Sequence, residues 1–340
     1  MIMFYDYPLF FERNRVFRVY KGGKLFSDFF GDEPEDGNYP EEWVASSVHA
    51  LNEGSTDEHE GISKISGTDI YLSDALKNFK KELIGDMKDL GILTKILDSA
   101  IRLPVQAHPD KTFSREYFSS EYGKEESWVI LATRPGAKIF YGFKKGVDKE
   151  QFSKAVEESE NSLTAMEDLL ETVDVKPGDV LYIPAKMVHA IGAGCLLLEV
   201  QEPTDFTVQP ERWCGDYRLS DNEMYLGISK EDALKCFDFD KTFPAPLKPV
   251  TISDNGGVKY ESLIDDRFTT SFNVRRITLD GGEFSLDKGA AIYVAVDGKG
   301  SISGDGYHKN IKKGDYFMIP EAAKNKFNIK GNISVVECFR

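Results

Sequence analysis

The sequence predicts a mainly β fold of two related β-modules, with a few helices in or beside the first module. Turn residues separate short apolar segments at close intervals along most of the chain, a pattern typical of β-sandwiches and barrels. In addition, residues 176–184 recur as residues 312–320, with Gly178 matching Gly314 at an offset of 314 − 178 = 136 positions. In both copies a Gly-Asp turn opens a strand that a proline closes.

The domain organisation follows from this repeat and from the length. A chain of 340 residues is long enough for about two domains and a sizeable core. Residues 334–337 also resemble residues 196–199, which adds a second matching strand to the repeat. Three prolines in residues 243–249 indicate an extended linker. We therefore expect one module over residues 1–243 and the other over 250–340.

Helical periodicity is confined to a few segments. Apolar residues recur at steps of three and four in the longest of them, which includes Leu72, Leu76 and Leu83. The expected helices cover residues 72–83, 93–97, 151–156, 163–173 and 229–237.

Composition and charge exclude several classes of function. Acidic residues outnumber basic ones by 57 to 42, and the net charge of −15 disfavours nucleic acid and anionic membranes as partners. The longest apolar stretches, such as residues 195–198, are far shorter than the roughly 20 residues of a spanning helix. Residues 1–13 lack the features of a signal peptide. The four cysteines are widely spaced, as expected for reduced thiols. We expect a cytoplasmic protein.

Two segments carry polar side chains that extended backbone would place on one face. Prolines 104 and 109 disfavour helix around Gln106 and His108, and alternate residues of a strand share a face. The same parity puts Lys124 and Glu126 together at the start of an apolar strand. Glu125 would lie on the opposite side.

A third segment supplies another imidazole. His189 follows the repeated strand, and its counterpart in the second module, at 189 + 136 = 325, is Asn325. The fold therefore does not require a histidine there, which favours a functional role for His189. Two imidazoles, a carboxylate and an amide oxygen from three strands would suit zinc or another borderline divalent ion. The alternative for each residue alone is a hydrogen-bonded core group or a solvated loop residue. The candidate ligands are Gln106, His108, Glu126 and His189.

These motifs also resemble a known family. Residues 93–111, 123–128 and 183–194, in this order, are similar to the short bacterial type of class I mannose-6-phosphate isomerase, a two-module cupin protein. The likeness extends over nearly the whole chain, from residues 20–24 and 42–46 to the C-terminal module.

The resemblance implies a fold, a reaction and a cofactor. It implies two cupin-type β-barrel or jelly-roll modules, the second without metal. It further implies interconversion of mannose 6-phosphate, or a related sugar phosphate, and its ketose through an enediol. One Zn²⁺ per chain would bind the four residues named above, with Lys124 beside the substrate. A small sugar phosphate is then the expected partner of a monomer or homodimer.

Further candidates for the site come from the same comparison of motifs. Gln209 stands where the family usually has an arginine, and Arg212 would reach the same space only if Pro210 redirects the chain. The catalytic base is left open among a zinc-bound water, Glu126 and Asp110. The candidates for substrate binding are Lys111, Lys186 and Tyr141.

Two other functions are compatible with a metal-binding cupin. A chain that has lost the family arginine could bind a sugar as a regulatory or non-catalytic module. An iron-dependent oxygenase is the other alternative, but such enzymes usually have three histidines or a facial triad with open positions, and an amide ligand fits this poorly.

Overall fold

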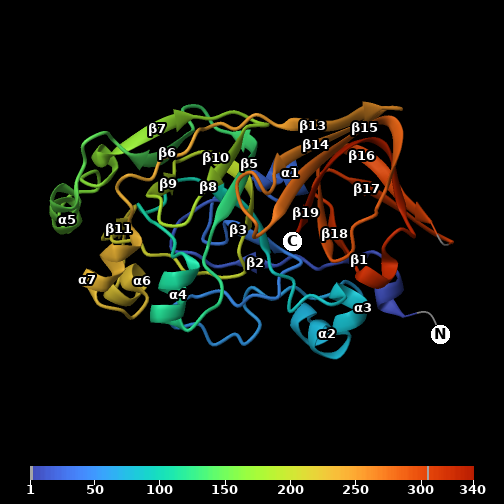
Figure 1. Cartoon of the computed structure of the whole chain (residues 1–340), viewed down its shortest axis with the longest axis horizontal. Coiled ribbons are helices and arrows are strands. Elements are labelled where there is room, and N and C mark those ends of the chain that lie inside the picture. The colour runs from blue at the N-terminus through green and yellow to red at the C-terminus, as the bar shows by residue number, and fades with distance from the viewer. Residues whose placement is uncertain (1–2, 305) are drawn as a thin grey trace.

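The computed structural model describes residues 3–304 and 306–340. Two groups of strands lie beside one another along the long axis of the molecule, one coloured green to yellow and one orange to red (Figure 1). Most helices lie around the edges of these two groups. The mainly β prediction is confirmed.

The first group contains a six-stranded antiparallel sheet and a smaller three-stranded one. The order of the large sheet is β2-β3-β4-β10-β5-β8, and that of the small one is β7-β6-β9. Strands β4 and β10 are buried along their whole length, which places them at the centre of the module. The strands are β2 (Arg15–Val16), β3 (Glu41–Val44), β4 (Leu93–Ser99), β5 (Glu126–Thr133), β6 (Lys138–Phe143), β7 (Leu170–Asp174), β8 (Val180–Ile183), β9 (His189–Ile191) and β10 (Cys195–Gln201), with a separate hairpin of β11 (Trp213–Cys214) and β12 (Tyr217–Arg218).

The helices of the chain are short. Asp110 caps the start of α4 by accepting a hydrogen bond from the Phe113 amide, and Asp148 forms a capping box with Gln151 in α5. The α-helices are α1 (Phe26–Phe30), α2 (Leu72–Asn78), α3 (Lys80–Ile84), α4 (Lys111–Phe118), α5 (Lys149–Glu158), α6 (Asp221–Tyr225) and α7 (Lys230–Ala233), and the 3₁₀ turns are η1 (Phe4–Asp6), η2 (Glu167–Leu169), η3 (Leu234–Cys236) and η4 (Glu321–Ala323).

The helix predictions are confirmed in part. Residues 72–83 form α2 and α3, which are separated at Phe79 by a non-helical backbone conformation. Residues 151–156 lie in α5, and residues 229–237 contain α7 and η3. The prediction for residues 93–97 is wrong, because they form β4 between β3 and β10. The prediction for 163–173 is also wrong, because η2 is followed there by β7, which pairs with β6. Short apolar runs do not distinguish helix from buried strand.

The second group is an eight-stranded sheet. Its order is β1-β18-β16-β19-β15-β14-β13, with β17 paired to β16. This order and that of the first module are open paths, so both modules are built from open sheets, as in jelly rolls, rather than from closed barrels. The strands are β1 (Leu9–Phe10), β13 (Val250–Asn255), β14 (Val258–Ile264), β15 (Asn273–Ser285), β16 (Ala291–Gly304), β17 (Tyr307–Lys312), β18 (Tyr316–Ile319) and β19 (Asn328–Phe339).

The internal repeat corresponds to matching elements. Strands β8 and β18 occupy equivalent places, and each follows a glycine in the left-handed region, Gly178 at φ 93° and Gly314 at φ 89°. A side chain is also excluded at Gly314, because a Cβ atom there would lie 2.2 Å from the Phe29 carbonyl oxygen. The repeated glycine therefore has a local role in the turn and, in the second module, a packing role against α1.

The two modules share strands and core. Strand β1, from the N-terminal end of the chain, pairs with β18 of the second module through Leu9↔Met318 and Phe10↔Phe317. One hydrophobic cluster contains Leu198 of β10 together with Val336 of β19. The division into residues 1–243 and 250–340 stays a prediction, and the sheet of the second module also includes residues 9–10.

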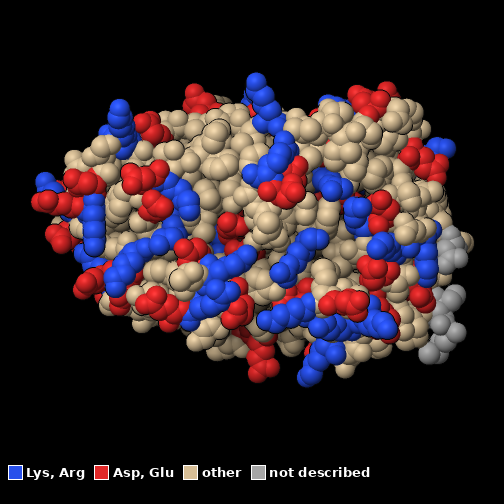
Figure 2. All heavy atoms as spheres, in the orientation of Figure 1, with Lys and Arg blue, Asp and Glu red and all other residues tan. Residues whose placement is uncertain are grey.

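The surface and the cysteines agree with the composition. Acidic and basic side chains are intermixed over the face shown in Figure 2, without a large area of one sign. All four cysteines are buried free thiols. Within residues 3–304 and 306–340, no helix has the length and apolar character needed to cross a membrane.

Candidate metal centre and its pocket

Gln106, His108 and His189 are brought together by backbone pairing. Gln106 and His189 form an antiparallel bridge in which each amide donates to the other carbonyl at 2.9 Å. Ala107 pairs in turn with Val208. Gln106 and His108 line one pocket while Ala107 does not, as the parity of an extended segment predicts.

Glu126 completes the cluster from a neighbouring strand. It is the first residue of β5 and lies between Gln201 of β10 and Ile183 of β8. Its carboxylate lies 3.1 Å from His108 Nε2 and 4.0 Å from His189 Nε2, and the two Nε2 atoms are 3.1 Å apart. All three residues are almost fully buried, and their ligand atoms lie within 4.8 Å of one another.

The hydrogen bonds of the two imidazoles identify the atoms that would bind a metal. His108 Nδ1 lies 3.0 Å from the Phe206 carbonyl, and His189 Nδ1 lies 2.9 Å from the Met187 carbonyl. A carbonyl only accepts, so Nδ1 carries the proton in both rings and each Nε2 presents a lone pair. Two lone pairs 3.1 Å apart repel each other unless a cation lies between or beside them.

Protonation of the imidazoles does not supply this cation at neutral pH, and the Lys124 ammonium contacts His108 Nε2 at 3.5 Å. Burial lowers the pKa of His108, and burial together with His108 lowers that of His189 to about 3. Burial alone would raise the pKa of Glu126, but the adjacent Lys124 ammonium outweighs it and holds the pKa of the carboxyl well below its usual range. Two neutral imidazoles and an ionised carboxylate are the donor set of a divalent metal ion, so the residues fit such an ion.

Gln106 and Lys124 lie beside these three residues. Gln106 is buried and lines the same pocket. Its amide oxygen would be the fourth donor. Lys124 is also buried, and its Nζ lies 3.0 Å from Glu126 Oε1 and 3.1 Å from Thr207 Oγ1. The ammonium group is thus held at the edge of the metal centre.

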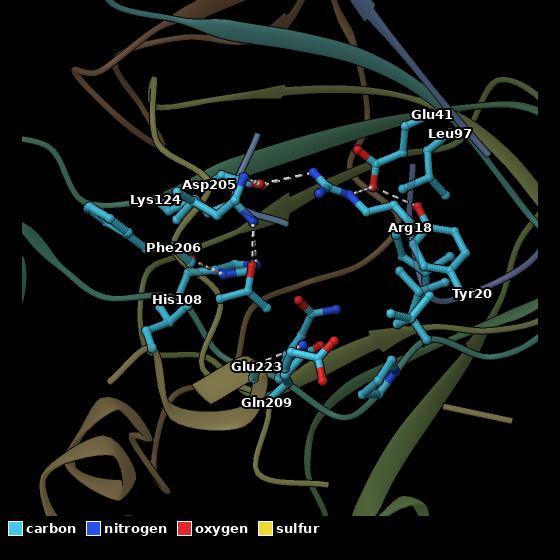
Figure 3. A pocket seen from close by; sticks show the side chains of 18 of the residues that line it. Arg18, Tyr20, Glu41, Leu97, His108, Lys124, Asp205, Phe206, Gln209 and Glu223 are labelled. Carbon is cyan, nitrogen blue, oxygen red and sulfur yellow. Dashed lines mark hydrogen bonds and ion pairs between the residues drawn. The ribbon is translucent and has the colours of Figure 1, made fainter. Parts of the chain in front are cut away.

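The pocket encloses about 390 Å³ and contains charges that the sequence analysis missed. Arg18 faces His108 from across the pocket (Figure 3). Its guanidinium pairs with Glu41 and with Asp205, each at 3.0 Å. Lys95 lies between Asp205 and Glu199, at 3.6 and 3.4 Å. Sequence offered one signal for Lys95 and Glu199: each is a charged residue inside a mainly apolar strand, where an unpaired charge is rarely tolerated.

These pairings shift the pKa values of the carboxyl groups. Burial raises the pKa of Glu41, but Arg18 and Lys95 outweigh it and lower the value to about 2. Glu199 behaves in the opposite way, because burial and the nearby Glu126 raise its pKa to about 7 despite Lys95. A carboxyl group that titrates near neutral pH therefore lies in the pocket.

Several predicted substrate-binding residues do not line the pocket. The Lys111 ammonium is bound to Glu202 and Ser271, and the Tyr141 hydroxyl donates to the Tyr182 carbonyl inside the core. Lys186 occupies the turn between β8 and β9 at φ 68°, a left-handed conformation that explains why glycine would be the more usual residue there. Asp110, a candidate base, is the N-cap of α4.

Packing also decides where the side chains of Gln209 and Arg212 lie. Gln209 lines the pocket, and its side-chain amide donates to the Glu223 carbonyl at 3.0 Å. Arg212 does not line the pocket, so the condition for its reaching that space is not met. Its guanidinium is bound to Glu160 at 2.6 Å, Asp221 at 2.8 Å and the Leu219 carbonyl at 2.8 Å. These three acceptors hold Arg212 beside α5 and α6.

The fold and the site define a two-module cupin with one buried metal-type cluster of His108, Glu126 and His189 among its described residues. Comparison with known proteins then identifies the family. The pattern of the catalytic domain of type I phosphomannose isomerase matches residues 21–127, and that of the cupin domain of mannose-6-phosphate isomerase matches residues 267–339. The mannose-6-phosphate isomerase ManA of Bacillus subtilis is 32% identical over 247 residues, which cover 71% of this chain and 72% of ManA.

The chain belongs to the mannose-6-phosphate isomerase family. Solved structures support the same fold. The crystal structure of a Bacillus subtilis mannose 6-phosphate isomerase has a TM-score of 0.79 at 24% identity and covers 98% of this chain and 99% of that one. A mannose 6-phosphate isomerase bound with zinc and yttrium has a TM-score of 0.70 at 16% identity, covering 98% of this chain and 99% of the other.

Proposed function

We propose that this protein is a zinc-dependent isomerase that interconverts mannose 6-phosphate and fructose 6-phosphate through an enediol. The proposal rests on the Nε2 atoms of His108 and His189, which lie 3.1 Å apart beside Glu126 in the pocket. The chain that forms this pocket belongs to the mannose-6-phosphate isomerase family. The ManA relative bears the name of this activity.

Zinc is the proposed ion, at one per chain. The donors are two imidazole nitrogens, a carboxylate and an amide oxygen, which suit a borderline divalent cation. A structure with the same fold was solved with zinc bound. Zinc when bound would act as a Lewis acid toward the sugar oxygens at C1 and C2. The proposed ligands are Gln106, His108, Glu126 and His189.

Two side chains are proposed to act on the sugar. Moving a proton between C2 and C1 creates negative charge on the adjacent oxygen. The Lys124 ammonium, fixed by Glu126 and Thr207, would stabilise that charge. Glu199 would carry the proton, because its pKa of about 7 allows it to accept and return a proton at neutral pH. Glu199 Oε1 lies 3.4 Å from the Lys95 ammonium and makes no hydrogen bond among the described residues.

The phosphate end of the sugar is proposed to meet Arg18. The cations that line the pocket are Arg18, Lys95 and Lys124. Arg18 has the most accessible side chain of the three, at 12% exposure against 4% and 5%. It also lies across the pocket from His108 (Figure 3), as the far end of a hexose requires. Asn52, which accepts from Arg18 at 2.9 Å, lines the same side.

A coupled assay on the zinc-loaded protein tests this function. We expect fructose 6-phosphate to form from mannose 6-phosphate, with turnover lost in Glu199→Gln. A panel of aldose phosphates and free mannose would define the substrate. If no member of the panel yields a ketose, the proposal is refuted. A cytoplasmic location and a monomer or homodimer stay predictions, and light scattering would measure the latter.

One observation favours a second candidate, a sugar-binding cupin without turnover. Gln209 occupies the place of the family arginine, and its amide is committed to the Glu223 carbonyl. This candidate predicts saturable sugar binding without isomerisation. Under it, Gln209→Arg would create activity in the coupled assay. Full activity of the unaltered protein would exclude this candidate.

A further inference from the structure

Glu125 lies between Lys124 and Glu126 but does not line the pocket. Its carboxylate instead accepts three hydroxyl hydrogen bonds. Tyr182 donates to Oε1 at 3.1 Å, while Thr269 and Ser271 donate to Oε2, the latter at 3.2 Å. Thr269 and Ser271 belong to the second module, and each is only 6% exposed. The second module thus contacts the residue before β5, which separates two candidate site residues.

The turn that presents these two hydroxyls is fixed by its own hydrogen bonds. The Ser271 amide donates to Thr269 Oγ1 at 3.0 Å, and the Thr269 amide donates to the Asp265 carbonyl at 3.2 Å. The Asp265 carboxylate is bound by Arg267. Residues 265–271 therefore present two fixed hydroxyl donors to the Glu125 carboxylate.

The same turn also reaches the segment that carries His108. Lys111, the first residue of α4, donates from Nζ to Ser271 Oγ at 3.0 Å and pairs with Glu202 Oε1 at 3.1 Å. Glu202 Oε2 accepts from the Glu125 amide at 3.3 Å. Close approach requires Gly123, because a Cβ atom there would lie 2.7 Å from the Pro109 carbonyl. The segments that carry His108 and Glu126 are thus joined at Ser271.

We propose that the second module positions Lys124 and Glu126 for metal binding and catalysis through an inter-module clamp of Glu125, Tyr182, Thr269 and Ser271. Successive residues of an extended segment point to opposite faces, so fixing Glu125 on one face fixes its two neighbours on the other. Glu125 is a positioning residue, because it acts through its neighbours. The part of the inference that concerns catalysis rests on the proposed function.

The test removes the two hydroxyls of the second module. Thr269→Val with Ser271→Ala keeps side-chain volume and loses both donors to Glu125. The matched control is Thr278→Val with Ser334→Ala, a half-buried hydroxyl pair 3.3 Å apart in the same module that does not contact the site. Thr269→Ser keeps the hydroxyl and serves as the rescue variant. Ser271→Ala alone is the milder variant if the double one does not fold.

Zinc affinity is measured by competition with a chromogenic chelator, and the visible spectrum of the Co²⁺-loaded protein reports ligand geometry. We expect the double variant to bind zinc about 10- to 100-fold more weakly, as for other residues that orient metal ligands, and to shift the cobalt spectrum. The rescue and control variants should match the unaltered protein.

Unchanged zinc affinity and cobalt spectrum in both the double variant and Ser271→Ala would overturn the proposal. An equal loss in the control pair would also overturn it, because the effect would then reflect stability alone. These readouts do not depend on turnover. If the unaltered protein fails to isomerise any sugar while the double variant still loses zinc, the proposed function fails and the clamp stands.

Discussion

Replacing Lys95 by methionine should destabilise the metal-stripped protein strongly. The Lys95 side chain is 4% exposed, and its ammonium lies 3.4 Å from Glu199, 3.6 Å from Asp205 and 3.9 Å from Glu41. Methionine preserves most of the volume of lysine but leaves these carboxylates without one of their two main cations. Removing one partner of a buried ion pair typically costs about 3–5 kcal/mol. We expect a loss of that size in the free energy of unfolding.

The pH dependence of this loss follows from Glu199. Its pKa is raised from 4.5 to about 7, so the folded state holds a proton that the unfolded state releases. Stability therefore falls as pH rises from about 4.5 to 7, by about 3 kcal/mol in total. Without Lys95 the pKa of Glu199 rises further, and the fall continues above pH 7. The difference between Lys95→Met and the unaltered protein should thus be larger at pH 8.5 than at pH 6.

Urea unfolding at the two pH values measures both effects. The control is Lys259→Met, because Lys259 pairs with Glu261 at 2.7 Å but is 43% exposed. An exposed pair contributes less than about 1 kcal/mol. A loss in Lys95→Met that is no larger than in this control, or one that does not grow with pH, would refute the argument for a buried charge network.

Three further predictions concern the metal and the substrate. His189→Asn gives the first module the residue of the second and removes an imidazole ligand, so zinc should bind more than about 100-fold more weakly in chelator competition; affinity within tenfold of the unaltered protein would contradict the ligand assignment. Stripping the metal should abolish isomerisation and lower the melting temperature, since zinc at about 1,000 times its Kd stabilises by about 4 kcal/mol; identical melting curves would contradict a metal site. Arg18→Gln should raise the KM for mannose 6-phosphate about tenfold or more with kcat largely kept, as for loss of one charged hydrogen bond; an unchanged KM in the coupled assay would exclude Arg18 as the phosphate ligand.

Local patterns in the sequence were sufficient for the proposed metal ligands. Parity in extended segments paired Gln106 with His108 and Lys124 with Glu126, and all four line one pocket. The repeat singled out His189, which the backbone bridge to Gln106 brings to the same place. These inferences succeeded because a period of two residues is a property of the strand itself.

Local patterns failed where the outcome depended on neighbours. Residues 93–97 have the apolar content of a short helix, but β3 and β10 pair with them on both sides. Arg212 was placed conditionally near the pocket, but three acceptors beside α5 and α6 hold it elsewhere. Lys111 is likewise held by Glu202 and Ser271 rather than by the pocket.

The sequence by itself determined the β class and the internal repeat, and it predicted the proposed metal ligands, because all of these follow from residue patterns along the chain. Only the tertiary structure decided which charges share the pocket. Arg18, Lys95, Glu199 and Asp205 come from segments far apart in the chain, and the packing of strands and loops brings them within 4 Å of an opposite charge. The clamp on Glu125 depends in the same way on how the second module packs against the first. Contacts of this kind leave no period in the sequence, since their partners are selected by burial and charge compensation after the sheets have formed.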